Sequence, residues 1–155
     1  MLRISKLADY GVVIMVYLAK HDTTLCKARD IASHTHLTQP TVSKLLKRLT
    51  AAGLLRSVRG VSGGYRLQRL AVDISIADII DALEGKLGLI ECSVEPNPCS
   101  LQHVCLIQGN WRLISQAIET ALDSVSLEAF ARPMLQSAIN LKSIHQIAGS
   151  LNNRE

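Results

Sequence analysis

Residues 38–53, with the sequence TQPTVSKLLKRLTAAG, decide the fold because their spacing predicts a single helix with two unlike faces. The apolar residues recur at intervals of three and four and form one stripe: Val42, Leu45, Leu46 and Leu49. Thr38 is expected to cap this helix, Pro40 is tolerated in its first turn, and Gly53 ends it. The stripe must pack against the rest of the protein, which leaves the other face to solvent or to a partner.

The opposite face of this helix carries only hydrogen-bonding and cationic side chains: Gln39, Thr41, Ser43, Lys44, Lys47 and Arg48. A short helix at residues 27–34 and a turn at residues 35–37 precede it, and together they predict a helix-turn-helix. In that motif the second helix lies in the major groove of DNA, with its N-terminal side chains near base edges and its cationic groups on phosphates. The six side chains are therefore our predicted DNA contacts on the helix.

A β-hairpin is predicted directly after the helix, with strands at residues 54–58 and 65–68. Its charged residues are all arginines: Arg56, Arg59, Arg66 and Arg69. Glycines near the tip, Gly63 and Gly64 among them, let a backbone approach DNA closely. Taken alone, the segment also fits an ordinary glycine-rich hairpin with solvated arginines. Its position after a helix-turn-helix favours a winged helix, so Arg59, Gly63 and Gly64 join the predicted DNA contacts.

Charge is distributed unevenly along the chain of 155 residues, whose 48% hydrophobic content is typical of a folded protein. Residues 1–70 hold 12 Lys and Arg against 3 Asp and Glu, a net charge of +9, and residues 71–155 hold 5 against 10, a net charge of −5. A basic domain joined to an acidic one suggests a polyanionic partner for the first. A solvated surface without a partner is the alternative that charge alone leaves open.

The N-terminal segment predicts a cytoplasmic protein. Its apolar run, residues 7–19, contains Asp9, lacks a small-residue cleavage site and is shorter than the roughly 20 residues that cross a bilayer. In the reducing cytoplasm the four cysteines are expected to remain thiols, which favours metal binding or redox chemistry over structural disulfides.

Ser5 is expected to cap a first helix that ends near Lys20 and is apolar nearly all round. Such a helix should be buried on most sides, where the carboxylate of Asp9 would need a cation, hydrogen-bond donors or the positive end of the helix. The residues alone favour the helix end. Cys26, in the turn that follows, is interpreted as a small packed or partly exposed thiol without a role.

Three thiols lie close together in residues 92–105, CSVEPNPCSLQHVC, and the prolines between them forbid regular structure. Cys92, Cys99 and Cys105 could converge as a soft-ligand site, suited to zinc or iron–sulfur chemistry, with a fourth ligand supplied from elsewhere. Three unrelated or disulfide-linked cysteines are the alternative.

Two further helices flank this cysteine loop. Ser75 and Asp78 predict a capping box for a helix that ends at Gly85. After the loop, apolar residues alternate in steps of four and three, the spacing of a helix–helix seam: Ile107, Trp111, Ile114, Ile118, Ala121 and Val125. The seam favours a dimer interface, with intramolecular packing as the alternative.

The predicted architecture is mainly α, a winged helix-turn-helix with a small two-stranded wing and a long dimerisation helix. We divide it into a DNA-binding domain at residues 1–72, a connecting helix and cysteine loop at 73–105, a dimerisation helix region at 106–130 and a tail of unknown role at 131–155. No Ser-His-Asp arrangement, phosphate-binding loop or HExxH helix is visible in the sequence, so an enzyme is not expected.

Several stretches together resemble a known family: ISKLADYG at 4–11, TVSKLLKRLTAAGLLRSVRG at 41–60, GGYRL at 63–67, SIADIIDALEG at 75–85, and three cysteines followed by GNW. They resemble the winged-helix iron–sulfur transcriptional regulators that include IscR and NsrR, and most of all the regulators of SUF iron–sulfur cluster assembly. The resemblance covers roughly residues 1–130.

The resemblance implies a homodimer that binds promoter DNA under the control of an iron–sulfur cluster, of two or four irons, held by Cys92, Cys99 and Cys105. In IscR-like members the fourth ligand is a histidine at the position of Gln108, which is a poor iron ligand. In NsrR-like members it is an aspartate that corresponds to Asp9, so Asp9 is preferred, with His103 as a weaker candidate. The alternatives are a nitric oxide or redox-sensing repressor of the same family, and a zinc-stabilised or cluster-free thiol-based regulator.

Overall fold

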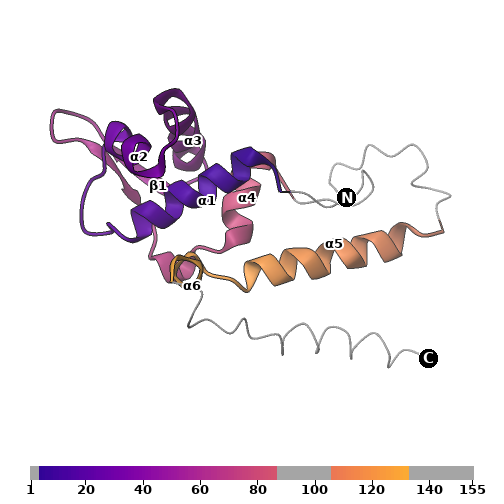
Figure 1. Ribbon diagram of the computed structural model, residues 1–155. Helices are drawn as coiled ribbons and strands as arrows, with labels where there is room; N and C mark the ends of the chain where they lie inside the picture. Colours follow the sequence, from indigo (N-terminus) through magenta and orange to yellow (C-terminus); the bar gives the residue numbers. More distant parts are fainter. Residues whose placement is uncertain (1–3, 87–105, 133–155) are drawn as a thin grey trace.

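A computed structural model describes residues 4–86 and 106–132 of the protein (Figure 1). The described chain is mainly helical with one two-stranded antiparallel sheet, as predicted. Its elements follow the order α1 (Lys6–Ala19), α2 (Ala28–Thr35), α3 (Gln39–Ala51), β1 (Leu55–Val58), β2 (Gly64–Leu67), the 3₁₀ turn η1 (Ala71–Asp73), α4 (Ile76–Glu84), α5 (Gln108–Asp123) and α6 (Leu127–Ala131). No helix in these two ranges is long and apolar enough to span a membrane.

The helix-turn-helix forms as the sequence predicts. The turn after α2 is made by His36, which adopts a left-handed conformation with φ of 55°. Thr38 occupies the N-cap position of α3, but its hydroxyl shares a hydrogen bond of 2.8 Å with the hydroxyl of Thr41 instead of capping the backbone. The stripe from Val42 to Leu49 is fully buried, which turns the polar face of α3 outward.

The wing is the antiparallel pair β1–β2, in which Leu55 lies opposite Leu67 and Arg56 opposite Arg66. Cys26 extends this sheet at its other edge. Its N–H donates to the carbonyl of Tyr65 at 3.0 Å, and its carbonyl accepts from the N–H of Tyr65 at 2.9 Å. Cys26 was predicted to be a thiol without a role; the thiol is buried, and the backbone of this residue fastens the wing to the segment before α2.

The predicted capping box begins α4. The Ser75 hydroxyl accepts a hydrogen bond from the N–H of Asp78, whose carboxylate accepts one in return from the N–H of Ser75. Gly85, with φ of 87°, ends the helix.

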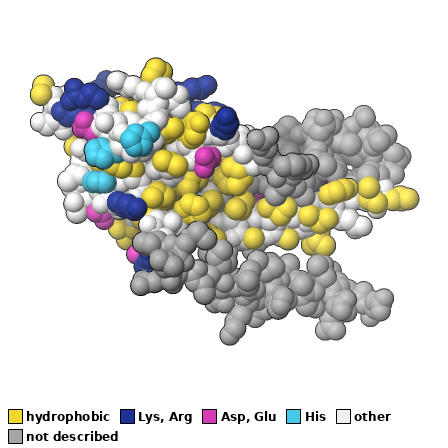
Figure 2. All heavy atoms as spheres, in the orientation of Figure 1, with side chains coloured by type: hydrophobic (Ala, Val, Ile, Leu, Met, Phe, Trp, Pro, Cys, Tyr) yellow, Lys and Arg dark blue, Asp and Glu magenta, His cyan; other side chains and the backbone are white. Residues whose placement is uncertain are grey.

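The chain returns to α4 after α5, because α6 begins beside the start of α4. Ser75 and Ser126 form an isolated antiparallel bridge, and the N–H of Leu127 donates to the carbonyl of Ile74 at 2.7 Å. From this joint α5 extends away from the rest of the fold (Figure 1). Figure 2 shows hydrophobic side chains exposed along that extension, and Leu113 and Ile114 remain 41% and 46% exposed.

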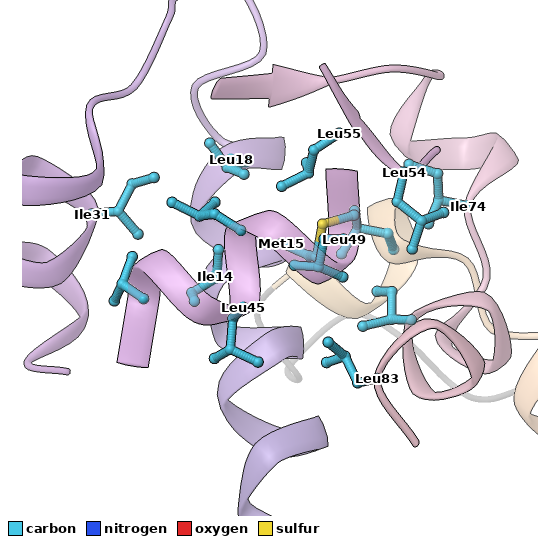
Figure 3. Packing of buried hydrophobic residues seen from close by; sticks show 14 of the residues in the cluster. Ile14, Met15, Leu18, Ile31, Leu45, Leu49, Leu54, Leu55, Ile74 and Leu83 are labelled. Atoms are coloured by element: carbon cyan, nitrogen blue, oxygen red, sulfur yellow. The ribbon is translucent and has the colours of Figure 1, made fainter. Parts of the chain in front are cut away.

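One hydrophobic core joins α1, α3, α4 and the wing. Figure 3 shows Met15 of α1 pointing toward Leu49 of α3 and Ile74, the residue before α4. All three side chains are completely buried. Gly11 allows α1 and α4 to lie close together, because a Cβ at this position would collide with the buried side chain of Leu83. The core therefore holds the helix-turn-helix, the wing and α4 as one packed head.

One part of the prediction for α1 was wrong. The helix is buried on most sides, but Asp9 lies on a face that the described residues leave exposed. Val13, one turn further along, is also exposed on this face. The carboxylate of Asp9 therefore does not need a buried cation to offset its desolvation.

Candidate DNA-binding surface and metal ligands

The outer face of α3 presents the side chains that the sequence assigned to DNA. Gln39, Lys44, Lys47 and Arg48 are exposed, whereas Thr41 and Ser43 are half-buried. Within residues 4–86 and 106–132, none of the three cationic side chains forms an ion pair. Their charge is thus available to phosphates, and Figure 2 shows Lys and Arg side chains gathered mainly over the head.

The tip of the wing combines a cation, tight backbone turns and one exposed apolar side chain. Arg59 directly follows β1 and is exposed. Gly60 has φ of 115°, and a Cβ on Gly63 would collide with the carbonyl oxygen of Val58, so both glycines are required by the turn itself. Val61 between them is 94% exposed. Sequence reasoning missed Val61, although apolar side chains on minor-groove binders often insert between base steps.

Gly64 was predicted to contact DNA, and the structure gives this glycine a separate role in packing. The residue is buried at the base of the wing. A Cβ at Gly64 would lie 2.8 Å from the carbonyl oxygen of Cys26, which is closer than real Cβ atoms approach. Close packing against the backbone of Cys26 therefore explains this glycine.

The four arginines of the wing differ in their bonding partners and in their positions on the hairpin. Arg69 donates to Asp78 and to the carbonyl of Asp73, both at 3.2 Å, so it fastens the end of the wing to α4. Arg56 and Arg66 project from the strands and are exposed. Only Arg59 lies at the tip.

Asp9 lies near the contact that joins the start of α1 to α4, and beside an apolar hollow. The hydroxyl of Ser5 caps α1 and donates to Glu84, which fixes the start of α1 against the end of α4. Asp9 also lines an apolar hollow of about 510 Å³ between α1, α4 and α6, whose walls include Val13 and Phe130. In the described part of the chain the Asp9 carboxylate forms no hydrogen bond or ion pair.

The other predicted ligands are distributed as follows. Cys92, Cys99, Cys105 and His103 lie outside the described residues. Gln108 is the first residue of α5 and is partly exposed. No three His, Cys, Asp or Glu side chains come together as a metal site in the part of the chain that the structure describes. The ligand set thus stays a prediction.

The thiol of Cys26 has low reactivity in this arrangement. Burial raises the pKa of its thiol above the ordinary value of 9.0, a hydrogen bond from Thr24 lowers it, and the charge of Asp30 adds to the increase. A protonated, buried thiol is a poor nucleophile and a poor metal ligand.

The geometry of a winged helix with a basic outer face agrees with a family comparison. The model of the Rrf2 family, described as iron-dependent transcriptional regulator, matches residues 4–133. This chain belongs to the Rrf2 family. It is therefore a DNA-binding transcriptional regulator and not an enzyme, as the sequence predicted.

Other Rrf2 proteins are similar to this one over most of their length. CymR of Bacillus subtilis is 33% identical over 131 residues, which are 84% of this chain and 90% of CymR. NsrR of Bacillus licheniformis is 27% identical over 124 residues, which are 79% of this chain and 85% of NsrR.

Solved structures of Rrf2 proteins share this fold. The structure of CymR, the global cysteine regulator of B. subtilis, has a TM-score of 0.67 at 33% identity and covers 84% of this chain and 97% of CymR. The structure of IscR from T. potens has the same TM-score at 32% identity and covers 88% of this chain and 93% of IscR. The family, the winged-helix fold and the relation to IscR and NsrR predicted from the sequence are thereby confirmed.

Proposed function

We propose that this Rrf2 protein is a cytoplasmic homodimer that binds promoter DNA of iron–sulfur cluster assembly (SUF) genes under the control of an iron–sulfur cluster. In this proposal α3 and the wing tip contact DNA, α5 pairs with α5 of a second copy, and Asp9 joins Cys92, Cys99 and Cys105 as a ligand. The observation that carries the proposal is that the Asp9 carboxylate lies on an exposed face of the head and has no partner within residues 4–86 and 106–132.

The DNA part rests on the outer face of the head. On α3, Lys44, Lys47 and Arg48 are exposed and lack acidic partners among the described residues. Cationic side chains on a recognition helix neutralise phosphates, and the residues at its N-terminal end, here Gln39 and Thr41, reach base edges.

The dimer part rests on α5. Its C-terminal end packs within the chain, since Leu122 in its last turn and Val125, two residues after it, contact the core. Toward the other end, Ile107 at the N-cap and Ile114 remain about half exposed. An apolar seam left open along one helix is the kind of surface that a second copy covers in a two-fold dimer.

The ligand part rests on Asp9. Asp9 lies in the first turn of α1, where the positive helix end attracts anionic groups, and a carboxylate oxygen can bind iron. Since Asp9 is exposed and makes no bond within the described residues, a segment bearing three thiolates could approach it without breaking an existing contact. One carboxylate and three thiolates are donors whose chemistry suits an iron–sulfur cluster.

A bound cluster supplies iron–thiolate bonds that oxidants, nitric oxide or iron shortage can break. The role of Asp9 is to fix the bound segment to α1, which packs directly on α3 through buried residues such as Met15 and Leu49. The position of the head, and thus the spacing of two recognition helices on DNA, would then depend on whether Asp9 is engaged.

The test compares wild type with Asp9→Asn after purification without oxygen, with iron and acid-labile sulfide measured per chain and the visible spectrum recorded. Asp22→Asn is the matched control, because Asp22 is an exposed carboxylate just beyond the other end of α1. We expect absorption from a cluster in wild type and in Asp22→Asn, and a weaker or altered spectrum in Asp9→Asn.

The same preparations are then titrated with SUF promoter DNA, with and without cluster, at one salt concentration. A difference in affinity between the two forms supports cluster control, and equal affinity contradicts it. Protein that carries zinc, or no metal after attempted reconstitution, would instead favour the zinc-stabilised or thiol-based regulator.

A further inference from the structure

Two arginines lie directly opposite each other on the wing. The register pairs Arg56 of β1 with Arg66 of β2. Their neighbours Leu55 and Leu67, also paired, face the core. Because successive side chains on a strand point to opposite faces, the two guanidinium groups share the outer face of the hairpin. Both side chains are exposed.

This pairing has no compensating partner in the described part of the chain. Neither Arg56 nor Arg66 forms an ion pair or a side-chain hydrogen bond there. The hollow of about 540 Å³ beside them is also lined by Asp22, Asp73 and Arg69. Arg69 is already bonded to Asp78, and neither aspartate pairs with the two opposed arginines. Like charges directly opposite on a sheet are destabilising, so the stability of the wing does not explain the pair.

The chemistry of the pair favours a phosphodiester. The planar guanidinium donates two parallel hydrogen bonds to phosphate oxygens, and two such groups side by side offer donors to one phosphate or to two neighbouring ones. The position on the hairpin favours DNA as the source. Arg56 precedes Arg59 at the wing tip by three residues, which is about 10 Å along a strand at 3.3 Å per residue. If the wing tip lies in a groove of the DNA, Arg56 and Arg66 therefore lie near the phosphate backbone at the edge of that groove.

We propose that Arg56 and Arg66 form a phosphate clamp, which grips the DNA backbone flanking the segment contacted by the wing tip. This inference rests on the proposed placement of α3 and the wing tip on DNA. Phosphates carry no base identity, so the clamp adds affinity and salt dependence without adding sequence preference.

The experiment measures binding of wild type, Arg56→Gln, Arg66→Gln and the double variant to a promoter duplex with long flanks, over a series of salt concentrations. We expect the slope of log affinity against log salt to become shallower by about 1 to 2 in the double variant, at about 0.9 per phosphate. The ratio of affinities for the operator and for a scrambled duplex should stay unchanged. Shortening the flanks should bring wild type to the affinity of the double variant.

Arg69→Gln is the matched control, because Arg69 lies on the same segment but is engaged by Asp78, so its salt slope should equal that of wild type. Urea unfolding separates loss of contact from loss of fold: removing one of two opposed charges should raise the unfolding midpoint of the single variants.

Three results would overturn the clamp while leaving the proposed function intact. The first is a salt slope in the double variant equal to that of wild type, and the second is a change in base preference without a change in slope. The third is that inorganic phosphate stabilises wild type but not the double variant while DNA affinity is the same in both, which would make the pair a site for a free anion. Failure of wild type to bind promoter DNA would overturn the clamp and the proposed function together.

Discussion

Arg69 and Asp78 are joined by a hydrogen-bonded ion pair of 3.2 Å between Nη2 and Oδ2. The same carboxylate oxygen accepts a hydrogen bond from the N–H of Ser75, also at 3.2 Å. One oxygen therefore connects the end of the wing with the capping box of α4. Through this contact the wing is fastened to the helix that precedes the cysteine loop.

We expect Arg69→Ala to lower the free energy of unfolding by about 0.5 kcal/mol, because both partners are more than one-third exposed and water screens the pair. Urea unfolding should show that the loss shrinks at high salt. Arg29→Ala is the control, since Arg29 is more exposed and lies 3.8 Å from its neighbour Asp30; it should change stability less. A loss that persists unchanged in high salt would contradict an electrostatic role for Arg69.

Lys47→Gln should weaken binding to all DNA sequences about equally and reduce the salt slope by about 1, because Lys47 is exposed on the outer face of α3 without an acidic partner in the described residues. Titrations of operator and scrambled duplexes over a salt series measure both quantities. Lys86→Gln, an exposed lysine after α4, should leave the slope as it is. An unchanged slope in Lys47→Gln would remove this lysine from the phosphate contacts.

Ile114→Lys tests the seam on α5. If a second copy covers Ile114, a charge there should raise the dimer dissociation constant about tenfold or more, which corresponds to about 1.4 kcal/mol. Sedimentation over a range of concentrations gives that constant. Gln116→Lys adds the same charge on another face of the helix and should leave the dimer intact. Equal dissociation constants for the two variants would place the interface elsewhere.

Gly64→Ala should destabilise the protein by about 1–3 kcal/mol, because the new Cβ would press on the backbone of Cys26, which cannot move without breaking its hydrogen bonds to Tyr65. Gly109→Ala is the control: nothing lies near a Cβ at Gly109, and alanine favours a helix. Urea unfolding measures both. Equal stability of Gly64→Ala and wild type would show that the backbone of Cys26 is loosely held.

Stability should fall as the pH rises above about 9, partly through Cys26. Burial raises the pKa of this thiol in the folded protein above its ordinary value of 9.0. The neutral thiol therefore stabilises the fold fully below the pKa of the unfolded chain, and this contribution is lost as the pH rises through the folded pKa. Urea unfolding between about pH 8 and pH 10.5 should show a steeper decline in wild type than in Cys26→Ala. Parallel curves would contradict the raised pKa.

Local patterns predicted much of this fold. The buried stripe of α3 follows from spacing, and the capping box of Ser75 and Asp78 follows from two residues three apart, so both were visible in the sequence. The packing reason for glycine at position 64 was not visible in the sequence, because it arises from Cys26, which is far away in the chain and near only in the folded sheet.

The candidate site was harder to predict for the same reason. Composition shows that α1 is apolar, but which of its faces stays open depends on where α4 and α6 pack, so the exposure of Asp9 was missed. The sequence does not distinguish the four wing arginines from one another. The structure does, because Arg69 is bonded to Asp78 whereas Arg56 and Arg66 lie opposite each other. Cys92, Cys99 and Cys105 lie outside the described residues, and their role stays a prediction.

The joint between Ser75 and Ser126 has a mechanical consequence. Two backbone hydrogen bonds and the completely buried Leu127 fix the C-terminal end of α5 to the start of α4. A rotation of α5 about this joint would therefore also move the head. With 16 residues, α5 is a lever arm of roughly 24 Å at 1.5 Å per residue. A sideways force on its far end, which begins three residues after Cys105, would therefore be transmitted to the head that carries α3.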